Sequence, residues 1–272
     1  MRRVPPSGFD ADKFLSAIYW HQGWDIFPGI RTPGRSGVVA IMERVGFPQD
    51  LSGKRVLDIG AWNGCAAFEC ERRGASDVVA LSLERSDSGF DQLKDLLQSE
   101  RCRFVRGSIY NLDPGELGKF DIVLCFGVIY HLRYPVLGID NLRRVARGSL
   151  FIESHVLDNC LLGEGGSSKR IYKLSGFHGW LARLSLIQFI KSDELYGDPS
   201  NWFSPSMSAL AGLLETAGFT VNAEQKIGER GYFGCDVNPG LPPFLQQSYE
   251  GQLYDEAGLD RLLGAKTDWQ LG

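Results

Sequence analysis

An acidic residue and two glycines stand where an apolar run gives way to a helical pattern. Asp58, Gly60 and Gly64 form Asp-x-Gly-x-x-x-Gly between the apolar residues that begin at Val56 and the helical pattern Cys65–Arg73. Gly60 permits a tight turn and lets the backbone approach a ligand closely. A dinucleotide site would have Gly-x-Gly-x-x-Gly here, and an acid at position 58 would repel a pyrophosphate. The loop therefore favours a cationic or amine-bearing ligand, and the alternative is a generic strand-to-helix turn capped by the acid.

Three further side chains could move a proton or hold a substrate. Tyr130 and His131 follow one apolar run, and Glu153 lies near the end of another. His131, with an unperturbed pKa near ~6.5, could take a proton from a hydroxyl or amine, or could merely fix its loop. Glu153 could be a base, bind a substrate cation, or pair with Arg31, because acids are seldom buried without a partner. Tyr130 could contact cofactor or substrate, or simply pack.

The elements that must position these residues alternate between short apolar runs and helical patterns of about ten residues. The predicted strands are Lys54–Ile59, Asp77–Leu83, Arg103–Gly107, Phe120–Phe126, Ser149–His155, Phe219–Lys226 and Tyr232–Val237. The predicted helices are Gly64–Arg73, Gly89–Gln98, Pro135–Ala146 and Pro205–Ala217, the last with Ser204 as N-cap. Continuous apolar strands that alternate with helices predict an α/β fold: a seven-stranded, mostly parallel, doubly wound (Rossmann-like) sheet with helices on both faces.

Two stretches interrupt this alternation. Residues 1–53 precede the first strand and are rich in aromatics, and residues 157–203 form an insert that is too long for an ordinary connection. We expect both to form a lid over the carboxyl edge of a domain that spans residues 54–240, and residues 241–272 to form a tail. Trp20, His21 and Trp202 could roof the site, or could belong to the core of the lid.

Composition and charge exclude several classes of protein. The chain has 272 residues, 43% hydrophobic and 23% charged, with a net charge of −4. It is an ordinary globular profile that argues mildly against a nucleic-acid coat protein. No apolar run reaches the ~18 residues of a membrane helix, and residues 1–12 do not resemble a secretory signal, so a cytoplasmic location is expected. The six cysteines lack metal-ligand spacing, which predicts buried reduced thiols and no metal site.

The Asp58–Gly64 loop resembles motif I of the class I S-adenosylmethionine-dependent methyltransferases. The resemblance implies that the loop holds the methionine part of S-adenosylmethionine. It assigns to the cofactor Asp58, Gly60, Ala61, Trp62, Asn63 and Gly64. It also implies an acid at the end of the second strand for the ribose, where Ser82, Leu83 and Glu84 stand and Glu84 is the favoured contact. The adenine and its surroundings fall to Ser108, Ile109, Tyr110, Phe126 and Gly127.

A more specific string, Gly-Val-x-Tyr-His-x-Arg-x-Pro from Gly127 to Pro135, resembles relatives of the tRNA wobble-uridine 5-oxyacetic acid (carboxymethoxyuridine) synthase family. Segments 20–34, 153–155 and 201–205 agree with it. From their places at the ends of the fourth and fifth strands, Tyr130, His131 and Glu153 are the candidate catalytic residues. Trp20, His21, Arg31, Thr32 and Trp202 are the candidates on the substrate side. The cofactor of the tRNA enzyme carries an extra carboxylate, which Arg31 or Arg133 could hold, but plain S-adenosylmethionine is expected.

Three functions follow for testing. The favoured one is methyl transfer to a small-molecule acceptor in specialised metabolism. The second is modification of a tRNA wobble uridine, for which the arginines at 143, 144 and 147 would contact the RNA. The alternative is that these arginines form a solvated helix face with no partner role. The third is a cofactor-binding protein without catalysis. No membrane partner is expected, and neither the acceptor atom nor the oligomeric state can be inferred from the sequence.

Overall fold

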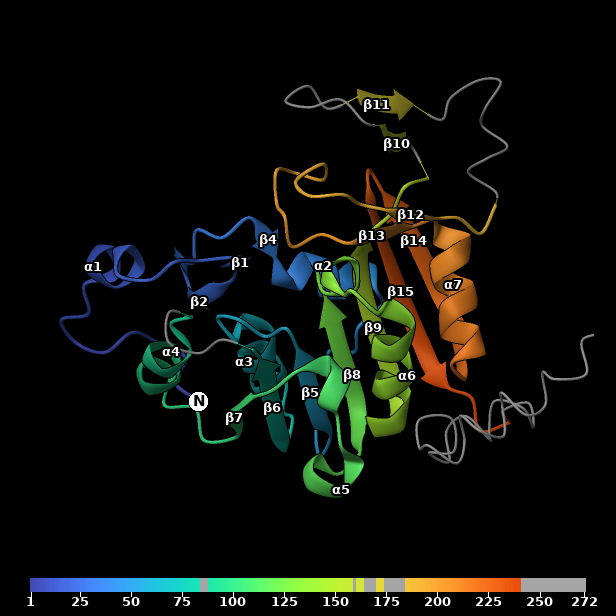
Figure 1. Cartoon of the computed structure of the whole chain (residues 1–272). Coiled ribbons are helices and arrows are strands. Elements are labelled where there is room, and N and C mark those ends of the chain that lie inside the picture. Colours follow the sequence, from blue (N-terminus) through green and yellow to red (C-terminus); the bar gives the residue numbers. More distant parts are fainter. Residues whose placement is uncertain (84–87, 159, 164–169, 174–183, 241–272) are drawn as a thin grey trace, which may run out of the picture.

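The computed structural model describes residues 1–83, 88–158, 160–163, 170–173 and 184–240. A seven-stranded sheet forms its centre, in the order β14-β15-β9-β8-β5-β6-β7 (Figure 1). Its strands are β5 (Arg55–Ile59), β6 (Asp77–Ser82), β7 (Cys102–Arg106), β8 (Phe120–Phe126), β9 (Ala146–His155), β14 (Phe219–Ile227) and β15 (Arg230–Val237). Neighbours from β7 to β9 are parallel, and β15 runs antiparallel to both β9 and β14. The predicted seven-stranded, mostly parallel fold is confirmed.

Both faces of the sheet are buried, and the side chains of each strand alternate between two apolar clusters. Along β5, Val56 belongs to one cluster and Leu57 to the other; along β8, Leu124 and Val123 divide in the same way. This burial on both faces explains why the parallel strands read as continuous apolar runs. The first face is covered by α2 (Val38–Arg44), α3 (Cys65–Arg72) and α4 (Phe90–Leu97), and the second by α6 (Pro135–Val145) and α7 (Met207–Thr216). The short helix α5 (Pro114–Leu117) precedes β8.

The helix predicted from Pro205 begins later than expected. Ser206 is its N-cap and accepts a hydrogen bond from the Ala209 amide, so α7 starts at Met207. Ser204 and Pro205 instead belong to strand β13 (Phe203–Pro205), which pairs with β12 (Ile187–Phe189). The prediction of Ser204 as N-cap is therefore wrong, because strand pairing outweighs the local Ser-Pro signal.

The N-terminal segment forms small elements above the carboxyl edge of the sheet (Figure 1). They are α1 (Ala11–Ser16), β1 (Gln22–Gly23), β2 (Asp25–Phe27), β3 (Ile30–Arg31) and β4 (Ser36–Gly37). Strands β1 and β4 pair in parallel and bring the backbones of Gly34 and Gln22 together. A side chain at Gly34 would collide with the Gln22 backbone, so this glycine serves a close approach of two chains.

The aromatic residues of this segment are largely core. Trp24 and Phe27 are 0% and 1% exposed, and both join the cluster that contains α3. Trp24 donates from Nε1 to Glu69 Oε2 at 2.9 Å and packs beneath the Arg72 guanidinium. By contrast, Tyr19 is exposed. Core packing thus accounts for Trp24 and Phe27, and the division of the chain into a lid, a domain and a tail stays a prediction.

The insert contributes strands β10 (Cys160–Gly163) and β11 (Arg170–Lys173), which pair with each other, as well as β12 and β13. In Figure 1 these strands lie beyond the same end of the sheet as the N-terminal elements. The predicted tail, residues 241–272, lies outside the described residues. Within the described ranges no helix combines the length and the apolar character needed to span a membrane.

Replacing Trp24 tests its place in the core. Trp24→Ala should lower the free energy of unfolding by about 3–5 kcal/mol, because it leaves a cavity against α3 and removes a partner from the Glu69 carboxylate. Denaturant unfolding followed by circular dichroism measures this, with the exposed Tyr19→Ala as the matched control. Equal, small effects of the two substitutions would mean that the segment covers the domain without stabilising it.

Candidate functional site

The loop between β5 and α3 has a backbone conformation that few sequences permit. Gly60 and Gly64 have φ values of +72° and +78°, and Trp62 is a non-glycine residue with a φ of +44°. A Cβ at Gly60 would lie 2.5 Å from Val128 Cγ2, and one at Gly64 would collide with the Phe90 ring. Strained backbone of this kind concentrates at ligand sites, where the surrounding packing maintains it.

Asp58 is the most unusual ionisable group at this loop. Its side chain is 2% exposed, and its Oδ2 atom has no hydrogen-bond partner among the described residues. Burial raises the pKa of its carboxyl group to about 7, and the backbone at Ala67 partly opposes the shift. Trp62 Nε1 is a second buried polar atom without a described partner, on the same loop.

These features fit the cofactor that motif I implies. S-adenosylmethionine carries an amino group, and a buried carboxylate oxygen without a partner is a suitable acceptor for it. The left-handed backbone at Gly60 and at Trp62 would allow the methionine part to approach the chain closely. The residues present therefore suit the cofactor, with Asp58 as the charged contact.

The side chain of Asn63 has a structural part, and its predicted contact with the cofactor stays a prediction. Its Oδ1 accepts from the amide of His21 at 3.0 Å and from that of Gln22 at 3.3 Å. Its Nδ2 donates to the carbonyl oxygens of Tyr19 at 3.0 Å and Ser88 at 2.5 Å. The Asn63 side chain thus fastens the N-terminal segment to the loop, and its amide is fully occupied by the protein.

The predicted ribose and adenine contacts lie at the ends of the next two strands. Ser82 ends β6 and is buried, Leu83 is 63% exposed, and Glu84 lies outside the described residues. After β7, the Ser108 hydroxyl accepts from the Tyr110 amide, and Ile109 packs in the core. Their roles toward the cofactor stay predictions.

Glu153 forms an ion pair that the sequence did not indicate. Its partner is Arg230 at the start of β15, which donates from Nε to Oε1 and from Nη2 to Oε2 at 2.8 Å. The same Nη2 donates to the Tyr130 hydroxyl at 3.2 Å, and the guanidinium lies 4.8 Å from the centre of that ring. Of the three alternatives for Glu153, the pairing with Arg31 is not formed, because Arg31 pairs with Asp25 at the exposed surface.

Arg230 was missed because the predicted last strand begins at Tyr232. The available signal was Glu153 itself, since a buried acid requires a cation. Burial raises the pKa of the Tyr130 hydroxyl, against the opposing effect of Arg230. Phe126 and Gly127 lead from β8 into this cluster, and a Cβ at Gly127 would lie 3.4 Å from the Tyr130 hydroxyl.

His131 lies beside this cluster, in the short 3-10 helix Ile129–His131. Its Nδ1 lies 2.9 Å from Ser200 Oγ, and that hydroxyl donates to Asp198 Oδ1 at 2.6 Å. Desolvation lowers the pKa of His131, so the imidazole is neutral near pH 7 and can accept a proton. His131 and Ser200 are 69 residues apart in the sequence.

A second histidine, His155, is buried behind the Glu153 cluster. Its Nδ1 lies 2.6 Å from Ser204 Oγ, and its Nε2 lies 3.9 Å from Glu229 Oε2. Burial and the nearby Arg230 lower the pKa of His155 to about 4, so it is neutral at physiological pH. Ser204 is fully buried as well, so this pair holds β9 and β13 together and does not face solvent.

The predicted substrate residues divide into two groups. Trp20 and Thr32 are buried: the Trp20 indole donates to Leu15 O at 2.8 Å, and Thr32 Oγ1 accepts from the Trp24 amide at 2.7 Å. His21 instead contacts the Trp62 ring edge-on at a centroid distance of 4.7 Å. On the other side, Trp202 packs against the Arg133 guanidinium at 4.4 Å from its ring centre. The first pair stabilises the N-terminal segment, and the second group borders the candidate site.

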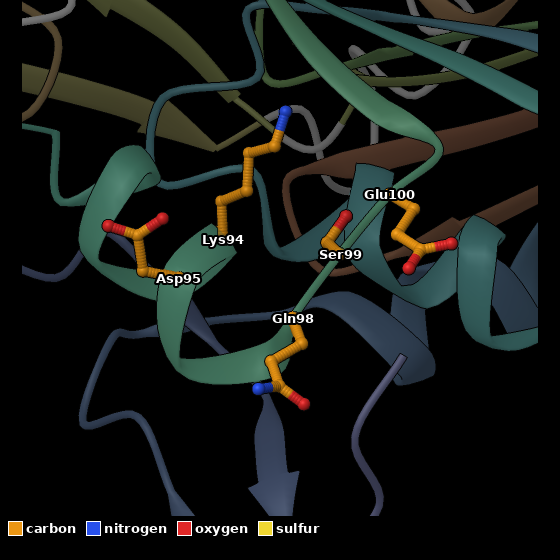
Figure 2. Close-up of a pocket in the computed structure, with 5 residues that line it drawn as sticks. All are labelled: Lys94, Asp95, Gln98, Ser99 and Glu100. Atoms are coloured by element: carbon orange, nitrogen blue, oxygen red, sulfur yellow. The ribbon is translucent and has the colours of Figure 1, made fainter.

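The one hollow that Figure 2 displays lies away from this edge. It has a volume of about 460 Å³ and is lined by Lys94, Asp95, Gln98, Ser99 and Glu100, at the end of α4. The labelled side chains point in different directions, and Lys94 and Ser99 are bonded to Cys102 O and to Glu71. A helix that begins at the carboxyl edge ends at the opposite one, so this hollow is no part of the candidate site.

The chain is similar in sequence to known methyltransferases. Residues 57–152 match the methyltransferase domain family. The tRNA U34 carboxymethyltransferase of Dichelobacter nodosus is 30% identical over 176 residues, which are 63% of this chain and 47% of that protein. The chain thus spans about half the length of the curated relatives it matches.

Solved structures share the fold. The N-terminal domain of EvdMO1, in the presence of S-adenosylhomocysteine (SAH) and D-fucose, has a TM-score of 0.55 and 18% identity, covering 84% of this chain and 94% of that one. A proposed S-adenosylmethionine-dependent methyltransferase from Listeria monocytogenes has a TM-score of 0.55 and 11% identity, covering 74% of this chain and 100% of that one. Residues 57–152 are therefore a methyltransferase domain, set in the fold of the S-adenosylmethionine-dependent methyltransferases.

Proposed function

We propose that the chain transfers a methyl group from S-adenosylmethionine to a small-molecule acceptor at the carboxyl edge of the sheet. The observation that carries this proposal is the buried Asp58 carboxylate oxygen without a described partner, next to a loop of left-handed backbone. Keeping such a group desolvated is costly unless a ligand completes it. The amino group of the cofactor is that ligand.

The chemistry divides between the cofactor and the chain. S-adenosylmethionine supplies the electrophilic methyl group of its sulfonium. The chain aligns the acceptor in line with that bond and excludes water. His131 accepts the proton of an acceptor hydroxyl or amine, for which its lowered pKa keeps it neutral. Tyr130, held by Arg230, borders the acceptor without giving up its own proton, since its pKa is raised.

The charge balance of the edge supports plain S-adenosylmethionine over its carboxylated form. Arg230 is engaged by both oxygens of Glu153, so its charge is already neutralised. Arg31 pairs with Asp25, and Arg133 packs on Trp202. A cofactor with an extra carboxylate would have to compete with Glu153 for the same guanidinium.

The arginines at 143 and 144 in α6 and at 147 in β9 support a small acceptor over an RNA. Arg143 donates to the carbonyl oxygens of Gly218 and Asn238, and Arg144 to Asn141. Arg147 forms a bidentate pair with Asp121 at 3.0 and 2.9 Å. Arg143 and Arg144 thus help to hold α6 against its neighbours, and Arg147 is paired with an acid.

Cofactor binding should depend on pH through Asp58. Because its pKa is about 7, the carboxylate that attracts an amine is mostly neutral at pH 6 and mostly ionised at pH 8. Calorimetry should show SAH affinity rising by up to about tenfold over this interval. Asp58→Asn should bind weakly and show little pH dependence. The same raised pKa means that the acid disfavours folding increasingly as pH rises from about 4 to 7, so Asp58→Asn should melt higher at pH 8.

Two results would contradict this assignment. Affinity that is flat with pH and unchanged in Asp58→Asn would remove Asp58 from the site. No SAH binding by the wild-type chain at any pH would reject methyl transfer altogether and leave a protein without this cofactor.

The choice between cofactors can be tested at Glu153. The wild-type chain should bind S-adenosylmethionine at least as tightly as carboxy-S-adenosylmethionine. Glu153→Gln frees the Arg230 charge and should shift the ratio of affinities toward the carboxylated form by about tenfold. Asp25→Asn, which frees Arg31 instead, is the matched control, and thermal melting verifies that each variant is folded. A wild-type preference for the carboxylated form would favour the tRNA-type cofactor.

Modification of a tRNA wobble uridine is the second candidate, supported by the curated relatives. With Arg143, Arg144 and Arg147 occupied by contacts within the protein, we expect no retardation of unmodified tRNA in gels at physiological salt. Binding that weakens steeply between 50 and 200 mM salt would overturn this expectation, because that slope reports phosphate contacts.

A further inference from the structure

His131 is connected to an acid through a serine that lies in the insert. Its Nδ1 has two neighbours, Ser200 Oγ at 2.9 Å and the Ser200 carbonyl oxygen at 3.4 Å. Ser200 Oγ lies 2.6 Å from Asp198 Oδ1, to which it donates. The order Asp198, Ser200, His131 joins the loop before β13 to the 3-10 helix after β8.

The hydrogen atoms in this chain can be assigned from the acceptors. A serine hydroxyl has one proton, and here that proton lies toward Asp198. Ser200 Oγ therefore offers only a lone pair to His131, as does the Ser200 carbonyl. Because both neighbours are acceptors, Nδ1 must carry the proton of the neutral imidazole. The lone pair then lies on Nε2, for which the described residues supply no hydrogen bond.

The charges around His131 are mixed. Asp198 and the Ser200 backbone raise its pKa; desolvation, which is the largest effect, and the charges of Arg230 and His21 lower it. Asp198 thus stabilises the imidazolium that would form when Nε2 accepts a proton. It does so through Ser200 and at a distance, which leaves the resting imidazole neutral.

The place of His131 suits a base. His21, which shares the influence of Asp198, packs edge-on against Trp62 of the cofactor loop at a centroid distance of 4.7 Å. On the other side, Tyr130 is adjacent, with the two ring centres 4.3 Å apart. His131 is thus adjacent to the Tyr130–Glu153–Arg230 cluster, and the charge of His21, which contacts the cofactor loop, influences its pKa.

We propose that Asp198 and Ser200 are positioning residues that hold His131 as the Nδ1–H tautomer, with Nε2 as the free base toward the acceptor. The proposal rests on the proposed function for its use in methyl transfer, but the tautomer itself does not depend on it. The proton taken from the acceptor resides on Nε2, and the resulting cation is balanced by the Asp198 carboxylate.

A purely structural reading is available and can be separated from this one. Asp198 Oδ1 also accepts from the Ser200 amide at 2.9 Å, a local turn that stabilises the loop by itself. Asp198→Asn keeps an oxygen for that turn and removes only the charge. Ser200→Ala removes the hydroxyl, and Ser200→Thr restores one.

The experiment is nitrogen NMR of the imidazole rings in the full chain, without cofactor or acceptor, with His131 identified by the loss of its signals in His131→Asn. Wild type and Ser200→Thr should show the Nδ1–H tautomer. Ser200→Ala should show a substantial fraction of Nε2–H, while the matched control Ser185→Ala, which removes another insert hydroxyl, should match wild type. Asp198→Asn should keep the Nδ1–H tautomer and lower the proton affinity of His131 about three- to tenfold.

Each outcome decides the proposal. An Nε2–H tautomer in wild type, or a tautomer unaffected by Ser200→Ala, overturns the relay. An unchanged His131 pKa in Asp198→Asn reduces Asp198 to a turn residue. SAH affinity, measured in parallel, should be the same in Ser200→Ala and wild type. If no variant binds SAH while the tautomers behave as expected, the proposed function fails and the relay stands.

Discussion

The site depends on one constraint: a carboxylate held in the interior of the sheet. β5 is hydrogen-bonded on both sides, to β6 and β8, and helices cover both of its faces. Asp58, next to last in that strand, is 2% exposed, and burial raises its pKa to about 7. In the proposed function, the loop that follows brings the cofactor to this carboxylate. The left-handed conformations of Gly60 and Gly64 allow that approach.

Other ionisable residues at the carboxyl edge of the sheet are also paired, and these pairs differ in how deeply they are buried. Glu153 and Arg230 neutralise each other below the surface, and such a pair loses more when one partner is removed than it contributes when intact. His131 stands nearer to solvent, where an acid two contacts away biases its protonation. The degree of burial therefore determines which ionisable groups titrate near neutral pH, even among groups of the same residue type.

Much of the fold could be predicted because its signals are local. Continuous apolar runs mark strands that are buried on both faces, and Pro135 marks the start of α6 at the predicted residue. Motif I likewise lies within one strand, one turn and one helix. The misses are non-local. Arg230 meets Glu153 through the antiparallel pairing of β15 with β9, and Ser204 lies in a strand because β12 lies beside it. The periodicity of apolar residues in the sequence does not indicate which strands will pair with each other.

The side chain of Asn63 has a thermodynamic consequence. One amide group satisfies backbone atoms at Tyr19, His21 and Gln22 and also at Ser88, while its own backbone forms part of the ligand loop. The ordering of two segments that are distant in sequence, the one at 19–22 and the one at Ser88, is thus coupled to the ordering of that loop. Coupling of this sort is reciprocal: a ligand that narrows the ensemble of the loop also narrows that of the N-terminal segment, by the same free energy. The segment before β5 would therefore contribute to the free energy of ligand binding even where it contacts no ligand.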